Sequence, residues 1–377
     1  MVTIAVTAEP ADEPRVAVSP ETVKKLVGLG AHVKVEAGAG ARSRFSDDAL
    51  RAQGAEIVAT AADALRDADI LLKVRRPSAA DVAGLKPGAL VVAMLDPYGD
   101  SAALQALAGG NAALFSMEFM PRITRAQSMD VLSSQANLAG YKAVVDAAAM
   151  FQQAMPMMMT AAGTVPAAKV FVMGAGVAGL QAIATARRLG AQVSATDVRP
   201  AAKEQVASLG AKFIAVEDEE FKQAQTAAGY AKPMSAEYQA KQAELVASHI
   251  KNQDIVITTA LIPGRPAPRL ITRAMVESMK PGSIIVDLAA ERGGNCELTQ
   301  PGKTVEHNGV RIYAPLNLAG DIAVNASSLY AKNLYAFLET LIDKKEKKLA
   351  VNWDDEIVKG TLVARDGKIV HPSLQGA

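Results

Sequence analysis

The stretch that decides the fold is Lys169-Val-Phe-Val-Met-Gly174-Ala-Gly176-Val-Ala-Gly179, which continues into Leu180–Leu189. An apolar run of strand length is followed by three glycines in the spacing Gly-x-Gly-x-x-Gly and then by a helical pattern. The next predicted strand, Gln192–Thr196, leads directly into Asp197. A strand, a glycine turn, a helix and a second strand ending in an acid predict a Rossmann-like βαβ unit.

Each glycine of this unit has a physical task. Gly174 allows the tight turn, Gly176 lets a pyrophosphate approach the backbone, and Gly179 lets the helix pack closely on the strand. The helix that begins at Val177 offers free N–H groups and the positive end of its dipole to phosphates. The unit therefore predicts a dinucleotide-binding site.

The acid at the end of the second strand sets the expected cofactor. Asp197 would accept hydrogen bonds from the adenosine ribose and repel a 2′-phosphate, which predicts NAD(H) rather than NADP(H). Two alternatives stay open. Arg199 is near enough to serve a 2′-phosphate, and the unit could be a structural turn without a nucleotide.

Alternating strand and helix patterns extend in both directions from this unit. Strands are predicted before it at 2–6, 32–36, 56–58, 70–74, 89–95 and 113–116, and after it at 212–214, 255–258, 283–287 and 310–313. Two long helical patterns, 134–155 and 327–345, connect the two stretches. We therefore predict an α/β protein with two Rossmann-like, doubly wound domains joined by two long helices. The first comprises residues 1–133 plus a returning tail, 322–377, and the second comprises residues 134–321.

An uncharged segment, Ala147–Ala168, is long enough to cross a bilayer. It contains glutamines, prolines and a glycine, so we interpret it as a buried helix end plus a connection between domains, not as a membrane span. Its methionines, Met155 and Met157–Met159, are expected to pack between the domains.

A second polar constellation is Pro121-Arg122-Ile-Thr-Arg125-Ala-Gln127-Ser-Met-Asp130-Val-Leu-Ser133-Ser134-Gln135. Paired donors and acceptors of this density favour a ligand-binding role, and a Gln with an Asp can hold a carboxamide such as that of nicotinamide. A solvated loop with a structural ion pair is the alternative.

Composition excludes other classes of function. The chain has 377 residues, with 40 Lys and Arg against 39 Asp and Glu, and only 4% aromatic residues, which argues against nucleic acid as a partner. Cys296 is the only cysteine, so no internal disulfide forms and a reducing compartment fits. The four histidines have no metal-ligand spacing, and no metal site is expected.

These motifs resemble a known family. Met157–Pro166, Gly174–Leu189, the Arg122–Ser133 loop, Thr258–Gly264 and Gly293-Gly-Asn-Cys296 are similar to the NAD(H)-binding component of proton-translocating nicotinamide nucleotide transhydrogenases. The likeness covers nearly the whole chain, which resembles the separate alpha-1 subunit of bacterial enzymes with a split alpha chain.

The resemblance implies a function. The chain would bind NAD(H) and exchange hydride with NADP(H) on a partner component, coupled to proton translocation by membrane-spanning subunits. It would be a homodimer, held from the cytoplasm on the face of the inner membrane by those subunits. The implied nicotinamide-side residues are Arg122, Gln127, Asp130 and Ser133. The residues implied to hold the adenosine and pyrophosphate are Gly176, Val177, Asp197, Val198 and Arg199. Gly229 and Tyr230 would lie on a mobile loop that closes over the bound nucleotide, and Ala260 and Leu261 would line the site near the ribose or nicotinamide.

Two alternatives remain. An alanine dehydrogenase would share the fold, and Arg15 and Lys73 match positions that hold the pyruvate carboxylate and carbonyl there. The sequence around each of these two residues, however, is more typical of a surface residue or of a member of an ion pair. The general acid/base histidine expected after the strand 89–95 is also replaced by Asp96. A non-catalytic NAD(H)-binding regulator is the second alternative.

Overall fold

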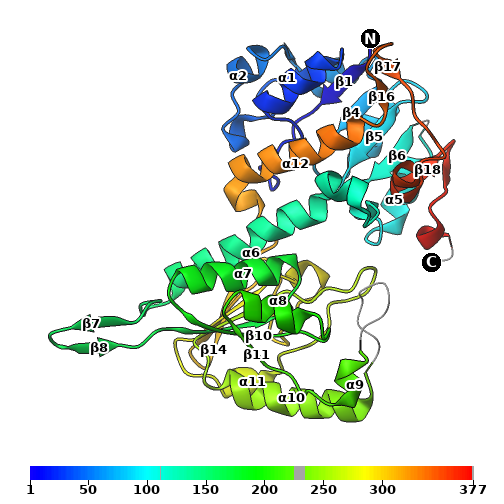
Figure 1. Ribbon diagram of the computed structural model, residues 1–377. Coiled ribbons are helices and arrows are strands. Elements are labelled where there is room, and N and C mark those ends of the chain that lie inside the picture. The colour runs from blue at the N-terminus through cyan, green and yellow to red at the C-terminus, as the bar shows by residue number, and fades with distance from the viewer. Residues whose placement is uncertain (111, 225–233, 376–377) are drawn as a thin grey trace. The chain divides into compact units, whose positions relative to one another are not determined.

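The computed structural model describes residues 1–110, 112–224 and 234–375 (Figure 1). The chain divides into two compact units, Met1–Gln135 with Ala319–Ala377, and Ala136–Leu318. Each unit is a mainly parallel sheet covered by helices, which confirms the predicted α/β class.

The first unit is built on an eight-stranded sheet in the order β19-β18-β6-β5-β4-β1-β2-β3. Its parallel strands are β1 (Thr3–Val6), β2 (His32–Glu36), β3 (Glu56–Val58), β4 (Ile70–Leu72), β5 (Leu90–Ala93) and β6 (Ala113–Ser116). Its helices are α1 (Pro20–Gly28), α2 (Asp47–Arg51), α3 (Ala61–Leu65), α4 (Ala79–Ala83), α5 (Ser101–Ala108), α12 (Ala323–Leu338) and α13 (Glu356–Thr361).

The end of the chain returns to this sheet. β18 (Leu362–Arg365) pairs antiparallel with β6, and β19 (Lys368–Ile369) pairs antiparallel with β18. Asp366 and Gly367 turn the chain between them with φ of 51° and 76°. Positive φ at both positions is what an Asp-Gly hairpin requires, and the flanking β-prone residues pair accordingly.

The second unit contains a seven-stranded sheet in the order β11-β10-β9-β12-β13-β15-β14. Its strands are β9 (Lys169–Met173), β10 (Gln192–Thr196), β11 (Lys212–Phe213), β12 (Ile255–Thr258), β13 (Ile284–Asp287), β15 (Val310–Tyr313) and the antiparallel β14 (Thr304–His307). Its helices are α7 (Val177–Arg188), α8 (Ala202–Ser208), α9 (Glu219–Lys222), α10 (Ala236–Ile250) and α11 (Arg273–Glu277), and α6 (Val131–Met150) crosses the boundary between the units.

Strand β9 is buried on both faces, which explains its unbroken apolar sequence. Val170 and Val172 pack in one core with Ile183 of α7, whereas Phe171 packs in a second core with Ile250 of α10. Helices α7 and α8 cover one face of the sheet, and α10 and α11 cover the other (Figure 1). Exposed side chains at the carboxyl edge of this sheet lie in the segments that follow the strands, among them Val198 after β10 and Leu261 after β12.

The uncharged segment after α6 differs from the prediction. The helix ends at Met150, and residues 158–165 form an antiparallel hairpin, β7 (Met158–Thr160) with β8 (Gly163–Val165). Met157 and Met159 are 57% and 78% exposed within the chain. Met155 is buried in a core of the second unit. The expected packing was wrong for Met157–Met159, because a two-stranded hairpin has no second layer to bury its side chains.

The second long helix also differs at its end. Helix α12 stops at Leu338, and the charged residues after it form a small hairpin, β16 (Ile342–Asp343) with β17 (Lys348–Leu349). Across the residues that the structure describes, no helix is long and apolar enough to span a membrane.

Candidate functional site

The glycine turn lies between the carboxyl end of β9 and the start of α7. Gly174 has φ of 104°, and a Cβ added there would lie 2.5 Å from the Thr259 hydroxyl. A Cβ at Gly179 would lie 1.8 Å from the carbonyl oxygen of Gly174. Only glycine fits at either position, because the turn, the helix and the end of β12 are in direct contact.

Gly176 is different, and it opens the turn to a ligand. It is the N-cap of α7, and its backbone is extended without a side chain to cap the helix. A Cβ added there would meet nothing within 4 Å. The start of α7 is exposed at Gly176 and Val177. The free N–H groups of a helix N-terminus with such space beside it suit an anion such as a pyrophosphate.

Asp197 follows β10 and is tied to the turn. Its Oδ2 accepts a hydrogen bond of 2.7 Å from the backbone N–H of Ala175. Arg199 donates to the same carboxylate through its backbone N–H, at 2.8 Å, and through Nε and Nη2, at 2.9 and 3.0 Å. Hydrogen bonding to Asp197 raises the pKa of the Arg199 guanidinium.

This pairing has a consequence for ligand binding. Each oxygen of Asp197 already receives two donors, so a ribose hydroxyl must displace the Arg199 side chain to reach it. Arg199 is 31% exposed at its side chain and can move, whereas the Asp197 side chain is 8% exposed. Val198 between them is half-exposed, at 49%.

The end of β12 completes this edge of the sheet. The Thr259 hydroxyl donates to the carbonyl oxygen of Gly174 at 3.1 Å, which fixes the two segments together. Ala260 and Leu261 follow, and Leu261 is 54% exposed. The structure thus brings Gly174, Gly176, Gly179, Asp197 and Ala260 to one edge of the second unit. Gly229 and Tyr230 lie outside the described residues.

The polar constellation lies in the first unit, around a 3₁₀ helix at Thr124–Met129 and the start of α6. Asp130 accepts hydrogen bonds from the backbone N–H and hydroxyl of Ser133, at 2.9 and 2.5 Å, in the geometry of a helix N-cap. Asp130 and Ser133 therefore have a structural task. Arg122 and Gln127 are exposed.

Two contacts hold this loop in place. Arg125 forms a bidentate ion pair with Asp355, with N–O distances of 2.8 and 3.0 Å. Asn333 of α12 donates to the Ser128 carbonyl oxygen at 2.8 Å and accepts from the Ser134 hydroxyl at 2.8 Å. Sequence reasoning missed both anchors, because the partners lie some 200 residues further along the chain.

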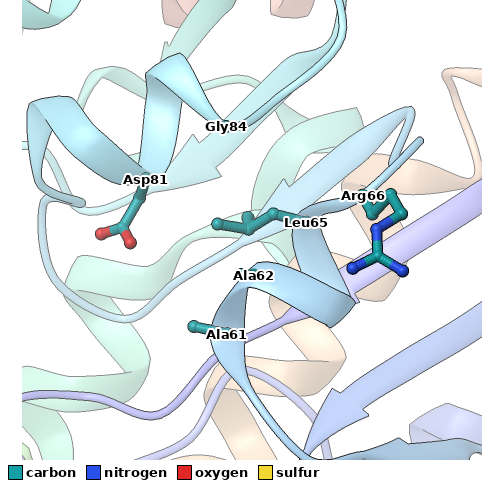
Figure 2. Close-up of a pocket in the computed structure, with 6 residues that line it drawn as sticks. All are labelled: Ala61, Ala62, Leu65, Arg66, Asp81 and Gly84. Atoms are coloured by element: carbon teal, nitrogen blue, oxygen red, sulfur yellow. The ribbon is translucent and has the colours of Figure 1, made fainter.

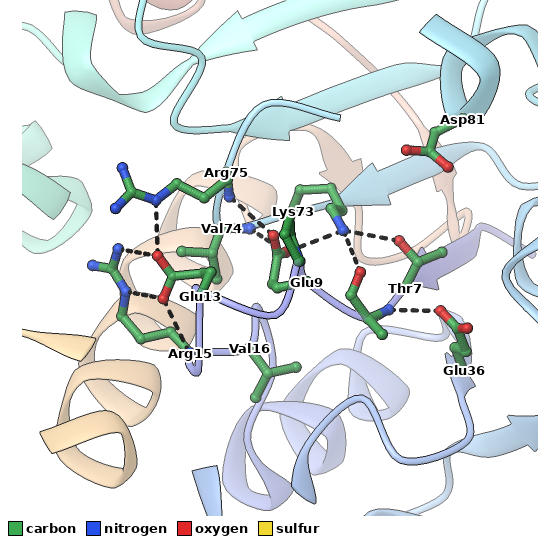
Figure 3. Close-up of polar contacts among 12 residues, drawn as sticks. Thr7, Glu9, Glu13, Arg15, Val16, Glu36, Lys73, Val74, Arg75 and Asp81 are labelled. Atoms are coloured by element: carbon green, nitrogen blue, oxygen red, sulfur yellow. Dashed lines mark hydrogen bonds and ion pairs between the residues drawn. The ribbon is translucent and has the colours of Figure 1, made fainter. Parts of the chain in front are cut away.

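A buried charge network, shown in Figure 3, occupies the ends of β1 and β4 in the first unit. Arg15 makes a bidentate pair with Glu13, at 2.7 and 2.6 Å, and donates to the Gln135 side-chain oxygen at 2.8 Å. Lys73 donates to the Ala8 carbonyl oxygen at 2.7 Å and lies 3.4 Å from Glu9. Arg15 and Lys73 are thus buried ion-pair residues; the surface alternative was wrong.

The two acids of the network titrate differently. Burial raises the pKa of Glu9 above its usual range, since it outweighs the charge of Lys73. Burial also acts to raise the pKa of Glu13, but hydrogen bonds and charges from Arg15 and Arg75 lower it to about 2. Glu13 is therefore ionised under ordinary conditions and holds both arginines.

Replacement of Glu13 tests this role through pH. Because its folded pKa of about 2 lies below the ordinary 4.5, Glu13 contributes about 3 kcal/mol of stability above pH 4.5, lost as the pH falls toward 2. We expect Glu13→Gln to lower the free energy of unfolding at pH 7, and the deficit to shrink on acidification. Urea unfolding at several pH values measures this. A deficit independent of pH would contradict it.

A hollow of about 390 Å³ on the first unit, between α3 and α4, does not resemble a site (Figure 2). Its lining residues are Ala61, Ala62, Leu65, Arg66, Asp81 and Gly84. Arg66 is already paired with Asp63, and Asp81 caps α4 through Ser78. Among the described residues, no group of three or more acidic, histidine or cysteine side chains is placed to hold a metal ion.

Comparison with known proteins identifies the family. The model "Alanine dehydrogenase/PNT, N-terminal domain" matches residues 5–139, and "Alanine dehydrogenase/PNT, C-terminal domain" matches residues 143–372. The chain belongs to the alanine dehydrogenase/PNT family.

Within this family the transhydrogenases are more similar than the alanine dehydrogenases. The chain is 57% identical over 369 residues to the first part of the NAD(P) transhydrogenase alpha subunit of Rhodospirillum rubrum, covering 97% of this chain and 96% of that one. A crystal structure of transhydrogenase from Sinorhizobium meliloti aligns with a TM-score of 0.89 and 62% identity, covering 98% and 100% of the two chains. An alanine dehydrogenase of Halomonas elongata is 30% identical over 373 residues, covering 97% and 93%.

Proposed function

We propose that this chain is the NAD(H)-binding component of a proton-translocating transhydrogenase, and that it exchanges hydride with NADP(H) on a partner subunit. The observation that carries the proposal is the open N-terminus of α7 at Gly176, beside Asp197. Near-complete coverage of the transhydrogenase subunits supports it.

The residues present fit a dinucleotide. The α7 N–H groups and Gly176 would hold the pyrophosphate, Asp197 would accept from the adenosine ribose once Arg199 moves aside, and bound NADH supplies the hydride. Hydride transfer between two nicotinamides requires no proton transfer at the reacting carbons. The protein's task is then to orient the ring and exclude water, with reacting atoms roughly 3–3.5 Å apart. Arg122 and Gln127 are our candidates for that orientation.

The sequence contains one dinucleotide fingerprint, at Gly174–Gly179. Because two nicotinamides must meet for transhydrogenation, a separate component has to supply the second. We expect the purified chain to catalyse no NADH-to-NADP⁺ transfer alone, and to do so after addition of an NADP(H)-binding component. An NAD analogue whose reduced form absorbs at its own wavelength allows the hydride transfer to be followed by absorbance. Full activity of the chain alone, or none in the mixture, would contradict the proposal.

The cofactor preference rests on Asp197. We expect NADH to bind much more tightly than NADPH, because the carboxylate would face the 2′-phosphate. Asp197→Asn should weaken the binding free energy of NADH by about 1–3 kcal/mol, because a charge-assisted hydrogen bond is lost. Asp197→Ala should reduce the difference in affinity between NADH and NADPH. Equilibrium dialysis with both nucleotides measures this, and equal wild-type affinities would refute the assignment.

The assembly follows from the same proposal. Membrane-spanning subunits would hold the chain at the cytoplasmic face of the inner membrane and carry the proton path. The chain would be a homodimer, and the exposed methionines of the β7–β8 hairpin are the surface that a second copy would cover. Sedimentation equilibrium of the isolated chain tests this, and a monomer at micromolar concentration would exclude it.

One observation bears on alanine dehydrogenase activity. Asp96, at the position expected for the acid/base histidine, has φ of 46°, and its backbone N–H donates to Glu118 at 2.8 Å. An alanine dehydrogenase needs a group that protonates a developing alkoxide or amine, and no histidine stands here to do so. Absence of pyruvate-dependent NADH oxidation would exclude this activity. A non-catalytic regulator would bind NADH but would transfer no hydride after addition of the NADP(H)-binding component.

A further inference from the structure

The side chain of Asn295 closes a loop at the ligand edge of the second unit. Its Oδ1 accepts a hydrogen bond from the Ala260 N–H at 3.0 Å. Its Nδ2 donates to the carbonyl oxygens of Ala260 and Pro268, at 2.9 and 2.8 Å. One N–H and two carbonyls fix the orientation of the amide, and its two donors are both used. Asn295 therefore joins the two ends of the segment 261–267.

Asn295 is itself held rigidly. It is 0% exposed, and it follows Gly293 and Gly294, which have φ of 93° and 82°. A Cβ at Gly294 would lie 2.6 Å from Oδ2 of Asp287, the last residue of β13. That carboxylate accepts from the Cys296 N–H at 3.0 Å. The two glycines thus turn the chain sharply against β13, and this turn directs Asn295 toward β12.

The held segment projects outward. Residues 261–266 are exposed, and they include Leu261 at 54% and Ile262 at 45%. Apolar side chains exposed at the carboxyl edge of a parallel sheet are placed where a flat ring of a ligand can pack. A loop of this kind has to be fixed at its base if it is to present those side chains in one position.

The strand order says which half of a dinucleotide the segment would meet. Strand β9, with the glycine turn, lies between β10 and β12. Asp197, for the adenosine ribose, follows β10, so the other nucleotide extends across the turn toward β12. The segment clasped by Asn295 follows β12.

We propose that Asn295 is a positioning residue for the nicotinamide half of the bound dinucleotide, acting through Ala260 and Leu261 without touching the ligand. This inference rests on the proposed function. It gives a buried side-chain amide, 35 residues from Ala260 along the chain, a role in orienting the nicotinamide ring. Adenosine and pyrophosphate contacts lie on Gly176 and Asp197 and do not depend on it.

The test compares two ligands on the same variants. ADP would fill only the adenosine and pyrophosphate positions, whereas the nicotinamide half of NADH would also contact the segment after β12. We expect Asn295→Ala to raise the dissociation constant of NADH about tenfold and that of ADP by less than about twofold. In Asn295→Asp one side-chain oxygen can still accept from the Ala260 N–H, but the other replaces the amide donor and repels the two carbonyl oxygens. This variant should therefore also weaken NADH binding and leave ADP binding nearly unchanged. Isothermal titration of each ligand measures both constants.

Asn252→Ala is the matched control. Asn252 is an exposed asparagine that precedes β12 at the opposite edge of the sheet, and both constants should stay at the wild-type values. Equal loss of ADP and NADH binding in both Asn295 variants would show that Asn295 supports the whole unit, which overturns the proposal. An unchanged NADH constant overturns it too. Failure of the wild type to bind NADH would instead refute the proposed function.

Discussion

Gly176→Ala is expected to leave the fold intact and to weaken NADH binding roughly 100-fold, whereas Gly179→Ala is expected to damage both. The two glycines stand three residues apart in one motif, yet their surroundings differ. An added Cβ meets nothing within 4 Å at Gly176, and lies 1.8 Å from the Gly174 carbonyl oxygen at Gly179. The first Cβ would fill the space that a pyrophosphate needs, and the second would force the helix off the strand.

Unfolding by urea and titration with NADH separate the two effects. Gly176→Ala should stay within about 1 kcal/mol of the wild-type stability, and Gly179→Ala should lose several times that amount. Gly28→Ala is the control, since Gly28 ends α1 with open space around it and without positive φ. If Gly176→Ala binds NADH like the wild type, the open helix end at α7 is not the pyrophosphate site.

Gln127→Asn is expected to slow hydride transfer on the order of 100-fold while NADH affinity stays nearly unchanged. On the proposed function, most of the binding energy would come from adenosine and pyrophosphate contacts at Gly176 and Asp197, which this substitution leaves intact. Shortening the side chain by one methylene withdraws its amide by about 1 Å, and a misplacement of that size can cost about 100-fold in rate. Stopped-flow transfer rates with a partner component, and NADH titrations on the same protein, provide the two measurements.

Neighbouring residues supply the comparison for Gln127. Ser128→Ala changes an adjacent exposed side chain and keeps the carbonyl that Asn333 holds, so it should transfer hydride at the wild-type rate. Asp130→Asn should preserve the N-cap of α6, because an amide oxygen can still accept from Ser133. If Gln127→Asn loses affinity in proportion to rate, the loop contributes to binding and is not a positioning element.

The local features of this fold were predictable, because short-range patterns determine them. The apolar run of β9, the glycines after it and the pattern of α7 each follow from neighbours within a few residues. The same holds for the Asp366-Gly367 hairpin. The β7–β8 hairpin was missed, because its methionines look like core residues when only composition is considered.

Contacts between distant residues could not be predicted in this way. The hydrogen bond between Arg15 and Gln135 spans 120 residues, and nothing in either neighbourhood specifies it. The Arg199–Asp197 pair is the opposite case: its members are two residues apart, and both were expected to face the ligand. In the structure they face each other, because the carboxylate finds its hydrogen-bond donors locally. The ligand roles of these site residues stay predictions.

The return of the chain end to the first sheet sets an order of events during synthesis. β6 is made early, but its antiparallel neighbour β18 comes near the end of the chain, after the complete second unit. The second unit is contiguous in sequence and can therefore fold as soon as it has emerged from the ribosome. The first unit at that point still has β6 as an unpaired edge strand. During that interval the edge at β6 is a template for pairing with other nascent chains. β18 and β19, with the charged turn Arg365-Asp366-Gly367-Lys368 between them, then cover this edge and protect it from such pairing.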